Sequence, residues 1–408
     1  MLRVVHGKAF VRQLYICSAN VRGQLRYSPR YAFSTKLSGG TETQIRRQSR
    51  GPVLRYGTYQ RRELGGIPTV LLPPVVFGGL VVALWTWKCC MMVLFQNKII
   101  YMPGLPPNAR RETIAEYNHQ CSGIEWREES IRSLDGTKIS LCVASVNDFD
   151  VSQGRMVYIL YFQGNASSIP PRLPFLSPVL RMLRDRRVLD IPVRYTMVCC
   201  SYRGYWTSKG RPSEKGIALD AAASLDWIRE DFLRHGGRPT DSIPVAIWGQ
   251  SIGAGVATNL AAETHLFQES KPNLLLETLI LETPFISVRA MLETLYPQKW
   301  LPYRHLWPFL WNHLDSSKAL GVMSQRLKDA NMESPNVILL EAEKDELIPK
   351  EHGKVLEKRC KDSGLNVEKK TIDGALHTEV MVRPEGRLVV VEAVEEVAQR
   401  RFTSSRGT

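Results

Sequence analysis

The chain has 408 residues, a formal net charge of +14 at pH 7 and 44% apolar residues. This length allows one large α/β domain with additional segments. Residues 1–62 carry thirteen Lys or Arg and one acid, Glu42, so the remaining residues carry a net charge of only +2. A nearly neutral globular part argues against a general nucleic-acid-binding surface, and we expect no nucleic-acid partner.

The N-terminal segment is basic and free of acids. Its first 36 residues contain seven Lys or Arg, no Asp or Glu, and scattered Ser and Tyr. This composition is typical of a mitochondrial transit peptide, and residues 2–14 fit a basic amphipathic helix. The alternative is a basic cytosolic tail that precedes a membrane anchor. We assign residues 1–63 to a basic targeting segment and linker.

An uncharged apolar stretch follows over residues 64–87. About 20 apolar residues cross the hydrocarbon core of a bilayer as a helix, and Pro74 suits a helix start. We therefore predict a transmembrane anchor within residues 64–96, with Trp85, Trp87 and Lys88 near an interface. The alternative is a buried helix of a soluble protein. With the basic N-terminus, this span favours the mitochondrial inner membrane over the endoplasmic reticulum.

Residues 97–408 are predicted to form one α/β domain. A hairpin around Asp135-Gly136 leads into an alternation of strands and helices, which predicts a mostly parallel sheet covered by helices on both faces. The predicted strands are residues 124–133, 138–146, 156–162, 195–201, 244–248, 275–281, 337–340 and 367–372. The predicted helices are residues 214–233, 253–266, 350–363 and 385–400.

Two insertions interrupt this alternation. Residues 169–194 are rich in proline, and residues 285–314 are rich in aromatic side chains. The second insertion follows a strand end, where coverings of active sites lie, and an apolar cover suits an acyl chain. We expect most of its rings to pack as a helical layer and one or two to line a pocket.

The motif with the clearest chemistry is Gly249-Gln250-Ser251-Ile252-Gly253, which fits G-x-S-x-G. An apolar strand-like segment precedes it and a small-residue helical segment follows it. This context predicts a nucleophile elbow, a sharp turn that lifts the serine hydroxyl above the sheet edge. A Cβ atom at either flanking glycine would clash, because strand and helix pass close together.

A base and an acid follow Ser251 in the required chain order. Asp345 comes just after the predicted strand 337–340, and His377 follows the strand 367–372. A serine hydroxyl needs a base to accept its proton, and the unperturbed pKa of histidine suits that task. The carboxylate orients the imidazole. His305 and His313 precede the acid, and we interpret them as structural.

An oxyanion hole needs two further donors. The backbone N–H of Ile252, the residue after the serine, is the first. The second is expected from the loop Gln163-Gly164-Asn165-Ala166, which follows the predicted strand 156–162. Gly164 lets the backbone approach a substrate, and the N–H of Asn165 is our choice.

These motifs resemble the α/β-hydrolase superfamily, and more narrowly the membrane-anchored serine hydrolases related to lysophospholipid and monoacylglycerol lipases and to protein depalmitoylases. The resemblance covers residues 97–400 and rests on three stretches: Phe162-Gln163-Gly164-Asn165-Ala166, Ser201-Tyr202-Arg203-Gly204-Tyr205-Trp206-Thr207-Ser208-Lys209-Gly210-Arg211-Pro212-Ser213-Glu214, and Gly249-Gln250-Ser251-Ile252-Gly253 with the later Asp345 and His377.

The chain departs from the family pattern at Gln163, usually His, at Ser201, usually Asp, and at Trp206, usually Gly. Gln163 affects how the oxyanion loop is held. Trp206 either places a large ring near the mouth of the site or packs against a neighbour. We name both Gln163 and Trp206 as candidate substrate-binding residues.

No cofactor or metal is expected, because the eight cysteines contain no C-x-x-C pair. The resemblance implies a serine hydrolase that cleaves carboxylic ester or thioester bonds through an acyl-enzyme. Its expected partners are an acyl-ester or acyl-thioester substrate, of lipid or lipidated type, and a membrane. The alternative is an inactive membrane-anchored scaffold that keeps the fold.

Overall fold

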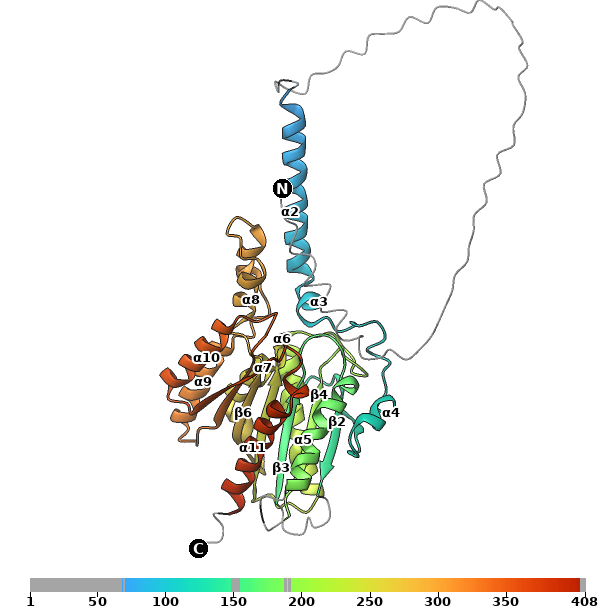
Figure 1. Ribbon diagram of the computed structural model, residues 1–408, viewed down its shortest axis with the longest axis vertical. Coiled ribbons are helices and arrows are strands. Elements are labelled where there is room, and N and C mark those ends of the chain that lie inside the picture. Colours follow the sequence, from blue (N-terminus) through green and yellow to red (C-terminus); the bar gives the residue numbers. More distant parts are fainter. Residues whose placement is uncertain (1–67, 69, 148–154, 187–188, 190–191, 404–408) are drawn as a thin grey trace, which may run out of the picture. The chain divides into compact units, whose positions relative to one another are not determined.

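The computed structural model describes residues 68, 70–147, 155–186, 189 and 192–403 (Figure 1). The predicted targeting segment, residues 1–63, lies outside them. The chain divides into two units, Met1–Leu84 and Trp85–Thr408, and their boundary falls within the helix α2.

Helix α2, Leu72–Leu94, lies inside the predicted anchor. It has 23 residues, none of them buried, and a mean hydropathy of 1.7. At 1.5 Å per residue it is about 34 Å long, against about 30 Å for the hydrocarbon core of a bilayer. Within the described residues, it is the one helix long and apolar enough to cross a membrane.

The strands of the described residues form one sheet in the order β1-β2-β4-β3-β5-β6-β7-β8. β2 pairs antiparallel with β1 and β4, and the other neighbours run parallel, so the predicted mostly parallel sheet is confirmed. The strands are β1 Arg127–Arg132, β2 Lys138–Val146, β3 Met156–Phe162, β4 Arg194–Ser201, β5 Ser242–Gln250, β6 Asn273–Glu282, β7 Asn336–Ala342 and β8 Val367–Ile372.

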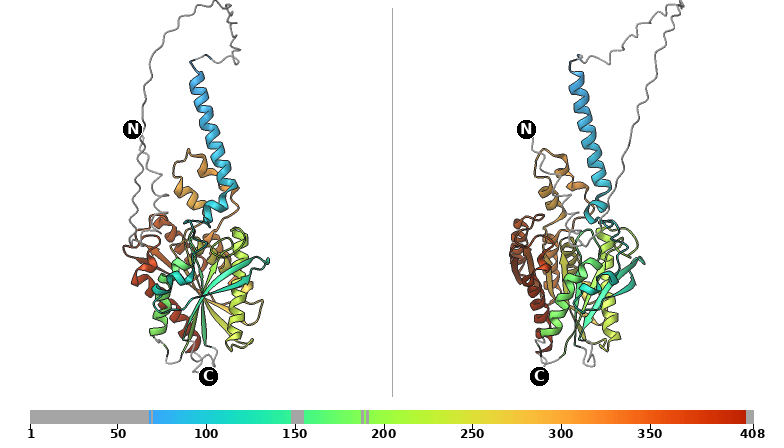
Figure 2. Two further views of the ribbon diagram at one scale, coloured as in Figure 1. Left: turned by 90° about the vertical axis from the view of Figure 1, so that its right-hand side faces the viewer. Right: turned by 45° about the vertical axis from the view of Figure 1, so that its right-hand side comes forward.

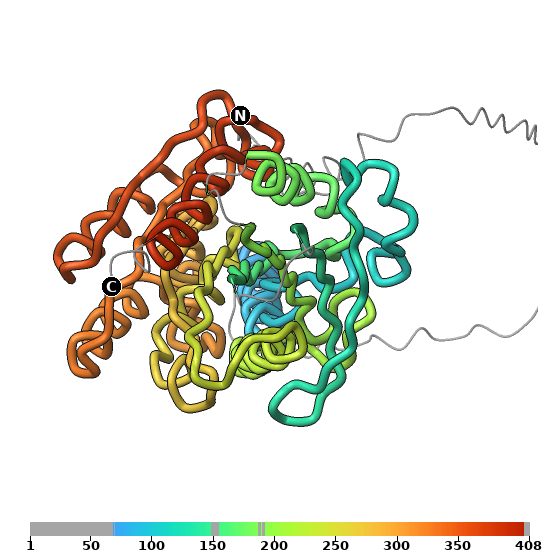
Figure 3. Tube along the Cα trace, turned by 90° about the horizontal axis from the view of Figure 1, so that it is seen from below, coloured from blue at the N-terminus to red at the C-terminus, as the bar shows by residue number. Residues whose placement is uncertain are grey.

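Helices cover both faces of the sheet, as predicted (Figures 1 and 3). One face carries α6 Glu214–Arg234, α7 Ile252–Ala262, α9 Ser316–Asp329 and α10 Lys350–Ser363, and the other carries α5 Leu173–Arg186 and α11 Pro384–Phe402. The shorter helices are α3 Gln96–Tyr101, α4 Ile114–Tyr117, α8 Val288–Leu295 and the 3₁₀ turns η1 Asn118–Gln120, η3 Pro170–Arg172, η4 Thr264–Phe267, η5 Pro302–His305, η6 Trp307–Phe309 and η7 Val380–Val382.

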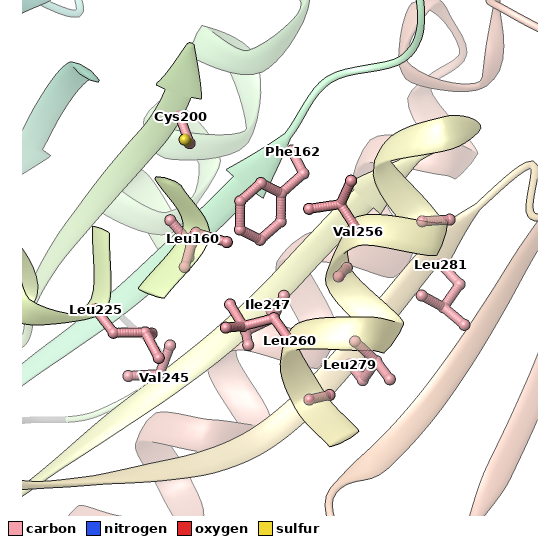
Figure 4. Packing of buried hydrophobic residues seen from close by; sticks show 14 of the residues in the cluster. Leu160, Phe162, Cys200, Leu225, Val245, Ile247, Val256, Leu260, Leu279 and Leu281 are labelled. Atoms are coloured by element: carbon pink, nitrogen blue, oxygen red, sulfur yellow. The ribbon is translucent and has the colours of Figure 1, made fainter. Parts of the chain in front are cut away.

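The apolar core lies in two layers because successive side chains of a strand point to opposite faces. Leu160 and Phe162 of β3 enter the core under α6 and α7, while Ile159 enters the core under α5 and α11. Figure 4 shows the first layer, where Ile247 of β5 and Leu260 of α7 lie side by side. Burial on both faces explains why the central strand β3 is a continuous apolar run, whereas the edge strand β8 carries charged, exposed residues.

The proline-rich insertion, for which the sequence predicted no helix or strand, mostly forms helix α5 with Pro178 inside. A proline within a helix removes one backbone hydrogen bond and disfavours helix. Here Leu176, Val179 and Leu180 are buried against the sheet and α11. Tertiary packing of this apolar row outweighs the local preference.

Successive strands are rotated relative to one another by the twist of the sheet (Figure 2). Because β3, β5, β6, β7 and β8 are parallel neighbours, their carboxyl ends lie along one edge. Ligand sites of open α/β sheets lie at that edge.

Candidate active site

The predicted site residues come from the carboxyl ends of adjacent strands. Gln163 follows β3, Ser251 follows β5, Asp345 follows β7 and His377 follows β8. Glu282, which the sequence analysis did not single out, is the last residue of β6 between them. The topology therefore gathers residues that are separated by more than 200 positions in the chain.

Ser251 lies in a sharp turn between β5 and α7 with φ 53° and ψ −116°. A positive φ is strained for a residue with a side chain and costs about 1–3 kcal/mol. The backbone N–H of Ser251 donates to the carbonyl of Glu282 at 2.8 Å. A Cβ at Gly249 would overlap the carbonyl of Gly253, and one at Gly253 would overlap the carbonyl of Phe162. The expected need for both glycines is confirmed.

Asp345 and His377 form a buried pair. The Nδ1 of His377 lies 2.8 Å from Oδ2 of Asp345. The side chain of His377 is 4% exposed and that of Asp345 is 7% exposed. Oδ1 of Asp345 accepts the backbone N–H groups of Leu347 and Ile348 at 2.9 and 2.8 Å. Burial is the largest single influence and raises the pKa of Asp345, but the hydrogen bond and charge of His377 together with these two backbone N–H groups outweigh it and lower that pKa. The carboxylate thus binds the ring at Nδ1, and Nε2 remains the ring nitrogen that can exchange a proton with another group.

The candidate oxyanion donors lie beside the elbow. A methyl group on Gly164 would lie 3.5 Å from Cβ of Ser251, so this loop passes directly over the serine. Asn165, the next residue, is half-buried. Ile252 is the first residue of α7, and the first N–H groups of a helix have no partner inside the helix.

The loop after β3 is held by a segment that we call the strap, residues 101–112. Ala166 and Ser167 both have positive φ, 55° and 61°, which is strained for residues with side chains. The backbone N–H of Ala166 donates to the carbonyl of Tyr101 at 3.0 Å, and that of Ser167 donates to the carbonyl of Leu105. The strap therefore stabilises an unfavourable loop conformation next to the serine.

The far end of the strap adds a side-chain contact. The buried hydroxyl of Ser168 donates to Oε2 of the half-buried Glu112. Tyr117 donates to the other oxygen, Oε1, at 3.3 Å. Burial raises the pKa of Glu112, and the hydrogen bonds from Ser168 and Tyr117 oppose that rise.

The two candidate substrate-binding residues are both buried. Trp206 is 2% exposed, and its Nε1 donates to the backbone carbonyl of Glu112 at 2.7 Å. This contact favours the packing alternative for Trp206. Gln163 is fully buried, its carbonyl accepts the hydroxyl of Tyr202 at 2.8 Å, and its side-chain amide has no hydrogen-bond partner among the described residues.

Glu282 is a buried carboxyl group behind the elbow. Its oxygens accept Nε1 of Trp248 at 3.0 Å and Nε2 of Gln250 at 2.9 Å, and Arg172 donates to the amide oxygen of Gln250. Burial raises the pKa of Glu282 to about 7, although these hydrogen bonds and the charge of Arg172 oppose the rise. The sequence signal for this residue was an acid directly after the apolar run Leu279-Ile280-Leu281 at the end of the strand.

Comparisons with known proteins identify proteins that are similar to this chain. No family model matches the chain. It is 36% identical over 162 residues to lysophosphatidylserine lipase ABHD12 of Gallus gallus, covering 40% of this chain and 39% of that protein. It is 26% identical over 257 residues to protein bem46 of Schizosaccharomyces pombe, covering 62% of this chain and 71% of that protein. The chain thus spans about two fifths of the length of the lipase.

A solved structure shares the architecture. The alpha-beta hydrolase from Vibrio vulnificus aligns with a TM-score of 0.53 and 17% identity, over 73% of this chain and 92% of that one. At this identity the likeness concerns the fold, and the predicted fold is confirmed.

Replacement of Glu282 tests its buried environment. Between the ordinary pKa of 4.5 and about 7, the unfolded chain releases this proton while the folded chain keeps it. The free energy of unfolding therefore falls as pH rises through this window, by up to about 3 kcal/mol for this group. In Glu282→Gln we expect this part of the pH dependence to be lost, as measured by urea unfolding at pH 5 and pH 8. Equal pH dependence in both proteins would contradict the assignment.

Proposed function

We propose that this chain, a member of the α/β-hydrolase superfamily, is a membrane-anchored serine hydrolase that cleaves carboxylic ester or thioester bonds of lipid or lipidated substrates. The observation that carries the proposal is the strained elbow of Ser251 at the same sheet edge as the hydrogen-bonded Asp345–His377 pair. Backbone strain of this kind persists where the surrounding structure enforces it, and it gathers at functional sites.

In the proposed mechanism, Oγ of Ser251 attacks the carbonyl carbon while Nε2 of His377 accepts the hydroxyl proton. The carbonyl oxygen becomes an oxyanion that the N–H groups of Asn165 and Ile252 stabilise. Collapse of this intermediate breaks the bond to the leaving alcohol or thiol, which receives the proton from His377. Water then attacks the acyl-enzyme with His377 again as base, releasing the acid and restoring Ser251.

The environment of Asp345 supports its proposed role. A carboxylate whose pKa is lowered stays ionised near neutral pH and stabilises the imidazolium that forms when Ser251 loses its proton. The two backbone N–H groups on Oδ1 fix the rotation of this carboxylate, so that Oδ2 faces the ring. The ring is thereby oriented before a substrate arrives, which lowers the cost of reaching the transition state.

The substrate class rests on two separate supports. A relative that shares 162 aligned residues is named a lysophosphatidylserine lipase, and we extend an ester of the lysophospholipid type to this chain as a proposal. Helix α2 is long and apolar enough to hold the enzyme at a bilayer, where such esters lie. We further propose the mitochondrial inner membrane as the location, from the acid-free basic N-terminus.

Labelling with a fluorophosphonate tests the nucleophile. The probe reacts with an activated serine, so we expect the wild-type protein to be labelled and Ser251→Ala to lose both labelling and more than about 10⁴-fold of its ester hydrolysis. Ser242→Ala, at the exposed opposite end of β5, is the matched control and should keep both. A folded wild-type protein that resists the probe would instead support the inactive scaffold. In that case Gln163 and Trp206 would be the first residues to replace by the usual His and Gly of the family.

Loosening the strap tests how the oxyanion loop is held. Ser168→Ala removes the hydrogen bond to Glu112, and we expect kcat to fall about tenfold with little change in KM, because the loop donor is displaced from the transition state. Tyr117→Phe removes the other hydrogen bond to the same carboxylate without touching the loop, and it should leave kcat nearly unchanged. Equal effects of the two substitutions on kcat would contradict a positioning role for the strap.

Targeting is tested by removing residues 1–40 from a chain tagged at its C-terminus. We expect mitochondrial fluorescence for the full chain and its loss after the deletion, because the basic acid-free segment is the import signal. Deletion of residues 404–408 serves as the control, because it shortens the chain but keeps the basic N-terminal segment. Unchanged localisation after the N-terminal deletion would contradict the transit-peptide hypothesis.

A further inference from the structure

The insertion at residues 285–314 exposes large aromatic side chains. Trp300 is 68% exposed, Trp307 42%, Phe309 58% and Trp311 59%, and we call these four side chains the aromatic face. Single exposed apolar residues are ordinary, but four exposed large rings within twelve positions of one insertion favour an apolar partner.

The tip of the insertion packs against the end of α2 that belongs to the same unit. The ring centroids of Trp85 and Trp300 lie 5.7 Å apart, and Nζ of Lys88 lies 4.4 Å from the centroid of the Tyr303 ring. Both α2 residues follow the boundary at Leu84, within the unit that carries the catalytic residues. The sequence predicts that Trp85 and Lys88, together with Trp87, lie near a membrane interface.

The base of the insertion is joined to the residue that opens α3. Nε2 of Gln96 donates to the carbonyl of Phe309 at 3.1 Å, and Oε1 of Gln96 accepts the backbone N–H of Trp311 at 2.7 Å. Trp85 and Gln96 are eleven residues apart, or about 16 Å along a helix. The insertion therefore contacts this part of the chain at two separate positions, and the depth of its tip is set by the depth of Trp85.

The composition of the insertion matches a membrane interface. Tryptophan is enriched at the headgroup level, where basic side chains also interact with lipid phosphates. Residues 285–314 contain three Lys or Arg and one acid. The guanidinium of Arg289 lies 4.1 Å from the centroid of the Trp307 ring, which joins a cation to the aromatic face.

Both ends of the insertion lie beside the candidate active site. It begins at Phe285, three residues after Glu282, whose carbonyl accepts the N–H of Ser251. It ends at Leu314, whose side chain packs so closely on Gly255 of α7 that a methyl group there would lie 3.0 Å from its Cβ. A surface that contacts a bilayer through this insertion would therefore be connected directly to the elbow.

From these contacts we infer that the aromatic face lies in the interfacial layer of a phospholipid bilayer, beside the end of α2, and that Ser251 takes its ester from that layer. The contact with the bilayer stands on the exposed rings and their attachment to Trp85 and Gln96. The identity of the substrate rests on the proposed serine hydrolase function, so the two parts are tested separately.

Cross-linking tests the bilayer contact without using activity. A benzophenone amino acid replaces Trp300 or Trp311 in the full chain, which is reconstituted in phosphatidylcholine vesicles that contain radiolabelled phosphatidylcholine. We expect lipid adducts after illumination at both positions and at Phe77, a 71% exposed residue of α2 that serves as the positive control. Val355, 45% exposed on α10, should give none. Adducts at Phe77 but at neither tryptophan, or equal adducts at Val355, would overturn the inference.

Hydrolysis tests the delivery of substrate. In the triple variant Trp300→Ser, Phe309→Ser and Trp311→Ser, we expect hydrolysis of a long-chain lysophospholipid in vesicles to fall about tenfold, because burial of aromatic surface in the bilayer is lost. Fluorophosphonate labelling and hydrolysis of a soluble short-chain ester should stay within about twofold, since the site itself is unchanged. The double variant Leu134→Ser and Val355→Ser removes exposed apolar side chains elsewhere and should behave as wild type on both substrates.

The two proposals fail in different ways. Equal loss on the soluble and the vesicle substrate would overturn the inference, because it would show damage to the site and not to delivery. Unchanged hydrolysis in vesicles would also overturn it. A wild-type protein that is neither labelled nor active on any ester would refute the proposed hydrolase function, while lipid adducts at Trp300 would still establish the bilayer contact.

Discussion

The backbone at Ser251 is the constraint on which the candidate site depends. Its positive φ is held because β5, α7 and the end of β3 meet without intervening side chains at Gly249 and Gly253. The hydrogen bond from the N–H of Ser251 to the carbonyl of Glu282 joins this turn to the neighbouring strand. The strained turn is thus enforced by the packing of three elements, and it projects the serine at the edge where the acid and the histidine lie.

Electrostatics behind the elbow follow from the same burial. Glu282 is enclosed between Trp248 and Gln250, so its carboxyl group titrates near neutral pH, whereas Asp345 keeps its charge because His377 is beside it. Two carboxyl groups at the ends of adjacent strands therefore differ in their preferred state. Asp345 pairs with the imidazole, and Glu282 accepts the side-chain amide of Gln250 and so holds the residue before the serine in place.

The segment that follows α2 connects this apolar helix to the sheet edge that carries Ser251. The strap holds the loop after β3 in a conformation that its own residues disfavour, and Gln96 holds the aromatic insertion that starts next to Glu282. Residues 96–112, directly after α2, thus contact both the loop over Ser251 and the insertion beside it.

Sequence alone predicted the alternation of strands and helices, the glycine requirement of the elbow and the pairing of Asp345 with His377, because each depends on local patterns and on the chain order of a known chemistry. Tertiary structure decided the rest. Helix α5 forms despite Pro178 because an apolar row packs on the sheet, and Trp206 is buried because the strap lies over it. Glu282 joins the site, and the insertion meets Trp85, through contacts between residues far apart in the chain. Such contacts leave no periodic signal in the sequence, since their energy comes from burial that exists only after the sheet has assembled.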